Sequence, residues 1–240
     1  MSVRPILFSA PMVRALLAGT KTQTRRAIRD QRRYRQSADG AGVWTGFMGW
    51  QSLEWALENH ELCAKGSLPG IAGGDLLWVR EATTRFDKGT CDQWVWYRAG
   101  RNSLLGMSPD LDPDAEWPSG KEGPAGGASY NVASIHMPRW ASRLPLLVTD
   151  VRVQRLQEIS EDDARAEGIE PDDTGTAWLC YASQPKGQTH WAAPRESYRT
   201  LWDSINGPSS WAANPWVAAY TFTVHQQNVD DFLADQARAA

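Results

Sequence analysis

Cysteine is scarce in this 240-residue chain, and its distribution excludes a disulfide framework. The three cysteines, Cys63, Cys91 and Cys180, are odd in number and widely spaced, and no Cys-x-x-Cys pair occurs. Disulfide-rich folds belong to oxidising compartments, whereas scattered thiols are typical of a reducing one. We therefore expect a cytoplasmic protein.

Motifs that bind metals or nucleotide cofactors are also missing. The four histidines, at positions 60, 136, 190 and 225, form no His-x-x-x-His or Cys/His pair of the kind that zinc sites use. No Gly-x-Gly-x-x-Gly or Walker-type loop opens a helix after a strand. The sequence thus predicts no metal centre and no cofactor.

Long apolar runs and a strong net charge are absent as well. Pro5 and Pro11 interrupt the apolar N-terminal segment, so we expect no signal peptide, no membrane span and no membrane partner. The formal charge of −3 argues against a protein whose whole surface attracts nucleic acid. A polyanionic partner would have to meet a local patch.

Tryptophan is abundant, with thirteen residues. Such large rings usually fill a core and fasten loops, and a minority of them can stack on nucleic-acid bases. We expect most of these rings to serve in packing.

Hydrophobic periodicity predicts an α+β fold. A strand over 5–9 leads to a helix that Ser9 begins and Gly19 ends. Few helices separate the strands, which favours a small, mostly antiparallel β-barrel with flanking helices. Further strands are predicted over 76–86, 93–99, 147–156 and 214–224, and further helices over 52–63, 160–167 and 194–205.

The domain organisation follows from the polar stretches. We expect one domain over 1–225 that carries two insertions, at about 27–72 and 100–140, because these segments are polar or rich in glycine and proline. Residues 226–240 are predicted to form a C-terminal tail or a loose helix.

A basic segment follows the first helix. It is either a solvated charged face or a patch that contacts phosphates, where Tyr34, Trp44 and Trp50 could add stacking. Its seven cationic residues are Lys21, Arg25, Arg26, Arg29, Arg32, Arg33 and Arg35.

Lys21, Thr24 and Glu167 are candidates for chemistry. A threonine hydroxyl becomes nucleophilic when a base takes its proton, and a lysine can be that base once burial or nearby positive charge depresses its pKa. Arg25 and Arg26 could supply the charge. Residue types alone leave the alternatives open, namely a basic strand end and a solvent-exposed helical glutamate.

Several motifs together resemble the ASCH domain, a PUA-like β-barrel family. The stretch GTKTQTRR is similar to the family's G-x-K-x-x-T-x-R signature, with Gly19, Lys21, Thr24 and Arg26 at the motif positions. GDLLWVRE is similar to its G-D-x-L-x-V strand, and VTDVRVQRLQEISEDDARAEGI to its strand and helix ending in a glutamate, here Glu167. HMPRWASR, LWDSING and NPWV resemble the long branch encoded by phages and prophages.

The resemblance implies a cleft that accepts RNA or a modified nucleoside. Small ASCH proteins hydrolyse the amide of acetylcytidine with a lysine, a threonine and a glutamate, which would be Lys21, Thr24 and Glu167 here. Related possibilities are RNA cleavage, RNA or modified-base binding without turnover, and a role in phage morphogenesis. The residues expected to contact substrate or nucleic acid are Arg25, Arg26, Trp78, Arg139 and Trp140.

Overall fold

The computed structural model of this chain falls into two compact units, each built from stretches that are separate in sequence. The first unit comprises Met1–Ser2, Gly19–Asp75 and Val148–Thr223, and the second comprises Val3–Ala18, Leu76–Leu147 and Val224–Ala240. The single domain expected over 1–225, with its two insertions, stays a prediction. The residues described are 1–39, 41–46, 49–58, 70–87, 93–99, 104–106, 128–181 and 189–239.

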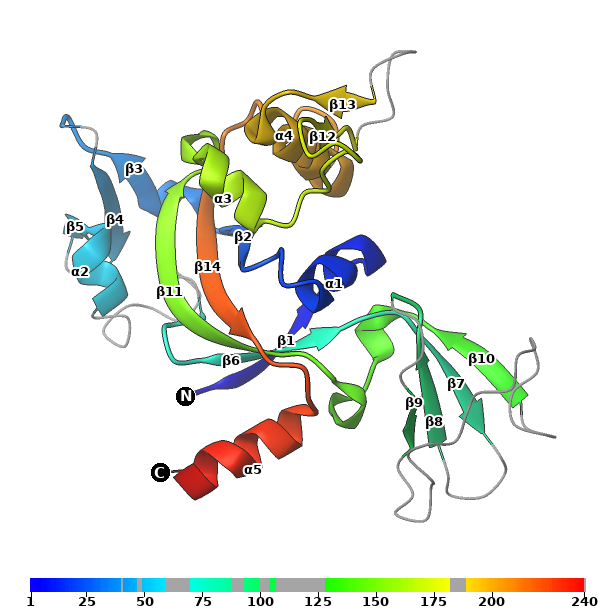
Figure 1. The fold of residues 1–240 in the computed structure, drawn as a ribbon. Helices are drawn as coiled ribbons and strands as arrows, with labels where there is room; N and C mark the ends of the chain where they lie inside the picture. The colour runs from blue at the N-terminus through cyan, green and yellow to red at the C-terminus, as the bar shows by residue number, and fades with distance from the viewer. Residues whose placement is uncertain are drawn as a thin grey trace. The chain divides into compact units, whose positions relative to one another are not determined.

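The first unit contains most of the long strand β11 and two helices, α3 and α4, that follow it in sequence (Figure 1). Its elements in chain order are β2 (Gln23–Ala27), η1 (Gln31–Arg33), β3 (Tyr34–Gln36), β4 (Gly42–Gly46), β5 (Gly49–Ser52), α2 (Leu53–Glu58), β11 from residue 148 onward (Pro145–Arg155 in full), η5 (Leu156–Glu158), α3 (Glu161–Ala166), β12 (Trp178–Leu179), β13 (His190–Trp191), α4 (Pro194–Asn206) and β14 (Trp216–Val224), whose last residue belongs to the second unit.

The second unit contains the first helix, the start of β11 and the last helix. Its elements are β1 (Val3–Leu7), α1 (Ala10–Leu17), β6 (Leu76–Arg80), β7 (Thr83–Asp87), β8 (Gln93–Tyr97), β9 (Leu104–Gly106), β10 (Ala128–Val132), η3 (Ser134–His136), η4 (Arg139–Ala141) and α5 (Val229–Ala239).

Antiparallel pairing dominates the sheets, as the sequence predicts. The largest has the strand order β1-β6-β11-β14-β2, in which β1 and β6 run parallel and the β11–β6 and β14–β2 pairs run antiparallel. Smaller sheets have the orders β10-β7-β8-β9, β3-β4-β5 and β12-β13. The α+β class is therefore confirmed. The described residues form no closed barrel, because β1 and β2 remain edge strands of the largest sheet.

Helix ends follow local chemistry. The Ser160 hydroxyl accepts a hydrogen bond from the Asp163 backbone N–H at 3.0 Å, which caps α3 as the sequence predicts. Gly168 and Gly207, which follow α3 and α4, have positive φ angles of 77° and 100°. These caps fix the ends of the two helices that flank the candidate site.

Two predicted elements differ in the structure. The single strand expected over 76–86 is divided into β6 and β7, because Glu81 between them is buried in an ion pair with Arg143 at 2.8 Å. The helix expected over 52–63 begins as α2 at Leu53, and residues 59–63 lie outside the described residues.

The C-terminal segment expected as a tail or a loose helix contains the helix α5. Val229 and Phe232 of α5 are buried with Leu76 and Trp78 of β6. Of the two alternatives for this segment, the structure contains the helix, and a few apolar residues of a polar segment carry its contacts.

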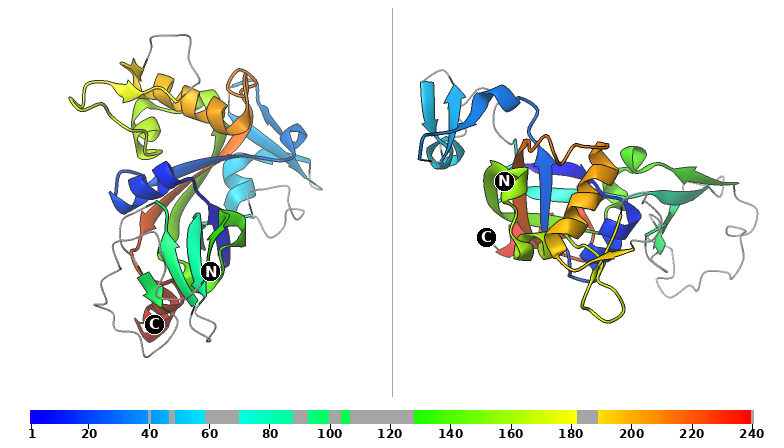
Figure 2. Two further views of the ribbon diagram at one scale, coloured as in Figure 1. Left: turned by 90° about the vertical axis from the view of Figure 1, so that its right-hand side faces the viewer. Right: turned by 90° about the horizontal axis from the view of Figure 1, so that it is seen from above.

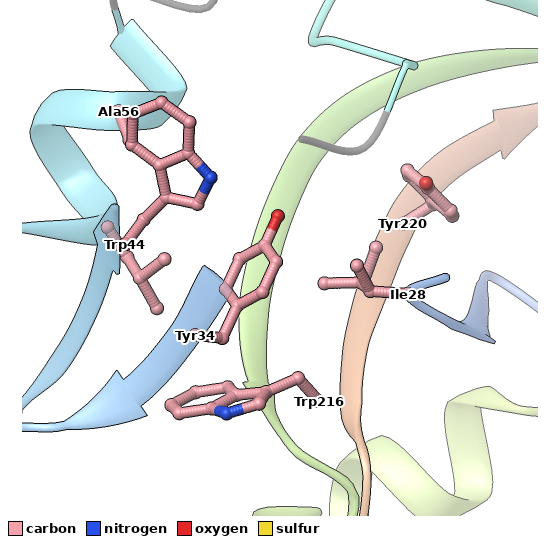
Figure 3. Close-up of a cluster of buried hydrophobic side chains, with 8 residues drawn as sticks. Ile28, Tyr34, Trp44, Ala56, Trp216 and Tyr220 are labelled. Carbon is pink, nitrogen blue, oxygen red and sulfur yellow. The ribbon is translucent and has the colours of Figure 1, made fainter. Parts of the chain in front are cut away.

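An aromatic core holds the β3-β4-β5 sheet in the first unit. Tyr34 and Trp44 are buried against Trp216 and Tyr220 of β14, and α2 packs on β4 and β5 (Figures 2 and 3). The Tyr34 and Trp216 rings lie 5.9 Å apart between centroids. Most tryptophans with described side chains are buried or half-buried, and Trp50 alone among them is exposed.

We predict that Trp216→Ala lowers the free energy of unfolding by about 3–5 kcal/mol, because it leaves a large cavity in this core. The same substitution at Trp50, which is 42% exposed, should change that free energy by about 0.5 kcal/mol or less. Urea titration followed by circular dichroism measures both. Equal losses in the two variants would show that the aromatic core does not stabilise this sheet.

Candidate functional site

The basic segment begins with a turn at Gly19 and a backbone bridge at Lys21 before it enters the largest sheet. Gly19 has a φ of 73°, which lets the chain turn after α1. Lys21 then forms an isolated antiparallel bridge with Glu167, and the Thr22 N–H donates to the Ala166 carbonyl at 2.9 Å. The end of α3 is thereby fastened to the start of β2.

Lys21 is completely buried and its ammonium group has three acceptors. Its Nζ atom lies 3.0 Å from Oε2 of Glu167, 2.7 Å from the Glu167 carbonyl oxygen and 2.9 Å from the Gln23 carbonyl oxygen. A lysine ammonium carries three N–H donors, so these contacts satisfy all of them. Two of the three residues that the motif resemblance selects, Lys21 and Glu167, are thus in contact.

Glu167 is buried and accepts hydrogen bonds from two cationic side chains. Its Oε1 atom accepts from Nη1 of Arg25 at 3.1 Å, while Oε2 accepts from Lys21. The hydroxyl of Tyr198 in α4 is near enough for the Glu167 charge to act on it. Packing of Ala164, Tyr198 and Val217 in one apolar cluster brings α3, α4 and β14 together around this group.

A second carboxylate joins the network. Asp163 accepts from Nη2 of Arg25 at 2.7 Å and from Arg152 at 3.0 Å, and Gln23 bridges Asp163 and Arg25. Three cations, Lys21, Arg25 and Arg152, therefore face two anions. A buried ionic network requires opposite charges and hydrogen bonds of this kind, and within the described residues the Nε atom of Arg25 is left without a hydrogen-bond partner. We call Lys21, Gln23, Arg25, Asp163, Glu167 and Tyr198 the buried cluster.

Burial changes two pKa values in the buried cluster. Desolvation lowers the pKa of Lys21 below its ordinary value of 10.5; Glu167 opposes this shift, and the positive charges of Arg26 and Arg25 add to it. Desolvation, together with the Glu167 charge, raises the pKa of Tyr198 well above 10, so this hydroxyl stays a hydrogen-bond donor. The pKa of Lys21 is therefore lowered by burial although a carboxylate lies beside it.

Thr24 and Arg26 follow Lys21 along the same strand. Thr24 is 1% exposed and its backbone pairs with Tyr220 of β14. Arg26 is half-buried, donates to the Arg25 carbonyl oxygen at 3.4 Å, and its charge acts on Lys21. The motif residues therefore occupy one short segment at the sheet edge (Figure 1).

The other predicted contact residues belong to the second unit. Trp78 is buried in β6 with the Arg80 guanidinium 4.7 Å above its ring. Arg139 is exposed and pairs with Asp230 at 2.6 Å. Trp140 is half-buried against a cluster that includes Tyr97.

Sequence patterns did not identify three members of the buried cluster. Tyr198 matches the apolar spacing of α4, and that spacing predicts a core ring. Asp163 lies three residues after the N-cap Ser160, where its backbone N–H donates to the Ser160 hydroxyl. Gln23 shares the strand face of Lys21 and Arg25, and this alternation of polar residues was the available signal.

The described ranges contain neither a metal-binding group of side chains nor a membrane-spanning helix. No group of three or more His, Cys, Asp or Glu side chains there could hold a metal ion. No helix there has both the length and the apolar character needed to cross a membrane.

We predict strong energetic coupling between Lys21 and Glu167. Lys21→Met or Glu167→Gln should each cost about 3–5 kcal/mol of unfolding free energy, because each leaves a buried charge without its partner. The double variant should cost clearly less than the sum of the two. Urea titration of the four proteins gives the coupling, and strictly additive losses would contradict it.

Acid should weaken the fold partly through Asp163. Burial by itself raises the pKa of Asp163, but hydrogen bonds and charges from Arg152 and Arg25 outweigh it, and the pKa lies below the ordinary 3.8. The folded state therefore binds this proton less readily than the unfolded state does. The resulting stability is complete above pH 3.8 and is lost as pH falls through the folded-state pKa.

The comparison of Asp163→Asn with Asp162→Asn tests this expectation. Asp163→Asn should be less stable at neutral pH and should lose less stability on acidification. The Asp162 side chain is 94% exposed, so its substitution should leave the acid profile nearly unchanged. Thermal unfolding between pH 2 and 7 measures both, and identical profiles for the two variants would contradict the assignment.

No family model, curated protein or solved structure matches this chain. The geometry of the buried cluster and the motif resemblance are therefore the two observations that bear on function.

Proposed function

We propose that this protein is a metal-independent hydrolase with a PUA-like, ASCH-type fold that acts on an acylated cytidine-type nucleoside, free or within RNA. The observation that carries the proposal is the contact of 3.0 Å between Nζ of the buried Lys21 and Oε2 of Glu167. It brings together two of the three residues that the motif resemblance selects, from positions 146 residues apart.

The proposed reaction is amide hydrolysis in two steps. In the first, the Thr24 hydroxyl oxygen attacks the acyl carbon while Lys21 takes the hydroxyl proton. The carbon–nitrogen bond breaks, the nucleoside amine leaves with that proton, and the acyl group remains on Thr24 as an ester. In the second, water attacks the ester, which releases the carboxylic acid and restores the threonine.

The contacts of the buried cluster support the roles of Lys21 and Glu167. The lowered pKa of Lys21 increases the share of neutral amine that can accept a proton. Glu167 orients that amine and is positioned to assist protonation of the leaving group. Arg26 adds positive charge beside Lys21, which suits an anionic substrate group or a developing oxyanion.

A second function is binding of RNA or a modified base without turnover. The observation that favours it is the closure of the cluster, because Lys21, Thr24 and Glu167 are 0%, 1% and 3% exposed. The Lys21 ammonium also has all three donors engaged. A substrate reaches Thr24 only if neighbouring side chains move aside, so a closed cluster suits a structural support beneath a binding surface.

We expect the protein to release cytidine and acetate from acetylcytidine. Thr24→Val should abolish this release, because valine keeps the shape of threonine and lacks its nucleophile. Thr22→Val is the matched control, since Thr22 is exposed and two residues away. Chromatography of the reaction products measures the rate, and circular dichroism verifies the fold. Release that survives Thr24→Val would overturn the nucleophile assignment, and retention of substrate without product would favour the binding function.

The rate should rise with pH through the depressed pKa of Lys21. A general base works only when neutral, and the pKa of this lysine lies below 10.5. Activity should therefore increase as pH rises toward the pKa of Lys21 and level off below 10.5. A profile of kcat between pH 6 and 10 tests this, and a rate that falls over this range would argue against a lysine base.

A further inference from the structure

The β3-β4-β5 sheet of the first unit has two chemically different faces. Tyr34 and Trp44 are paired neighbours in the strands and both point into the aromatic core. Because alternate residues of a strand point to opposite sides, Arg35, Thr45 and Trp50 share the other face. We call this the outer face.

An exposed aromatic ring and an arginine lie together on the outer face. The guanidinium carbon of Arg35 lies 3.8 Å from the centroid of the Trp50 ring, although the two residues come from different strands. Trp50 is 42% exposed and Arg35 is also exposed. Planar rings and guanidinium groups are the side chains on which nucleic-acid bases stack.

Positive charge is concentrated in the sequence around Arg35. Residues 29–36 contain four arginines and one aspartate, which give a net charge of +3 in a chain whose total is −3. Arg29 and Arg32 are exposed, and Arg33 is held against the sheet by its bonds to Asp30 at 3.0 Å and to the Thr45 carbonyl oxygen at 3.3 Å. Asp30 neutralises part of this charge. The guanidinium groups of the other arginines keep N–H donors that can contact phosphate oxygens.

We propose that the outer face binds single-stranded nucleic acid, with a base stacked on the Trp50–Arg35 pair and phosphates contacted by Arg29, Arg32 and Arg33. This proposal deepens the proposed function. It rests on that function for one point, namely that the modified nucleoside is part of a nucleic-acid strand. Binding by the outer face itself needs none of Lys21, Thr24 and Glu167.

The surface chemistry favours a polynucleotide over a membrane. Insertion into a lipid interface draws on several neighbouring apolar side chains. Among the described residues of the β3-β4-β5 sheet, Trp50 is the single exposed large apolar side chain. Its ring faces a guanidinium group, which is the arrangement of a stacking platform.

Fluorescence anisotropy with a fluorescein-labelled 12-nucleotide RNA tests the proposal. The wild type should bind at 50 mM KCl, and Trp50→Ala should weaken binding about tenfold or more through loss of stacking. Arg32→Gln should lower the slope of log K against log salt concentration by about 0.7. Both side chains are exposed, so both variants should remain folded.

Trp191→Ala and Arg199→Gln are the matched controls. They alter another tryptophan–arginine pair of the same unit, in which the guanidinium carbon lies 5.3 Å from the ring centroid. These variants should bind RNA as the wild type does. If wild-type protein leaves the RNA unbound at 50 mM KCl, or if all four variants bind equally well, the proposal is wrong.

Further ligands separate the alternatives. Single-stranded DNA of the same sequence should also bind and a duplex should bind less tightly, because its bases are already stacked. Vesicles of phosphatidylcholine and phosphatidylserine should not bind, and Trp50-dependent vesicle binding without RNA binding would overturn the proposal. Hydrolysis of free acetylcytidine should be unchanged in Trp50→Ala. Hydrolysis without RNA binding would refute the outer-face proposal alone, whereas RNA binding without hydrolysis would refute the proposed function alone.

Discussion

The buried ion pair between Lys21 and Glu167 is the contact on which the arrangement of the first unit depends. It joins the start of β2 to the end of α3 across 146 positions of sequence, and the backbone bridge between the same two residues makes the junction rigid. Taking two charges out of water costs several kcal/mol for each ion, so the pair persists only with full compensation. Arg25 and the two backbone carbonyl oxygens that Lys21 contacts supply most of it, which explains why several polar groups are buried in one place.

The same burial gives the cluster two opposite properties. Desolvation lowers the pKa of Lys21 and makes it suitable as a base, but three acceptors hold its ammonium form in place. The proposed chemistry at Thr24 would therefore require the network to loosen when a substrate arrives. Replacement of one acceptor by a substrate atom would weaken the hold of Glu167 on Lys21 and free the amine for proton transfer. Binding and activation would then be a single event at this site.

Local rules predicted part of this structure from the sequence. Ser160 and Gly168 mark the two ends of α3. The motif resemblance selected Lys21 and Glu167, and the structure brings them into contact. Sequence patterns could not predict that Tyr198 lies near Glu167, because helical periodicity marks a core position without saying which polar group its hydroxyl lies near. The division of 76–86 into two strands was also hidden, because it depends on a buried ion pair with the distant Arg143.

The basic segment illustrates why composition alone left two interpretations open. Lys21 and Arg25 lie where α3 offers carboxylates, so their charges are neutralised and buried. Beyond β2 the chain has turned away from α3, and the arginines of 29–35 meet one aspartate. Their charge therefore stays available to solvent, beside the one described tryptophan that the core does not cover. Partner carboxylates, rather than the number of cations, decide which part of the segment supports the fold and which part keeps its charge exposed to solvent.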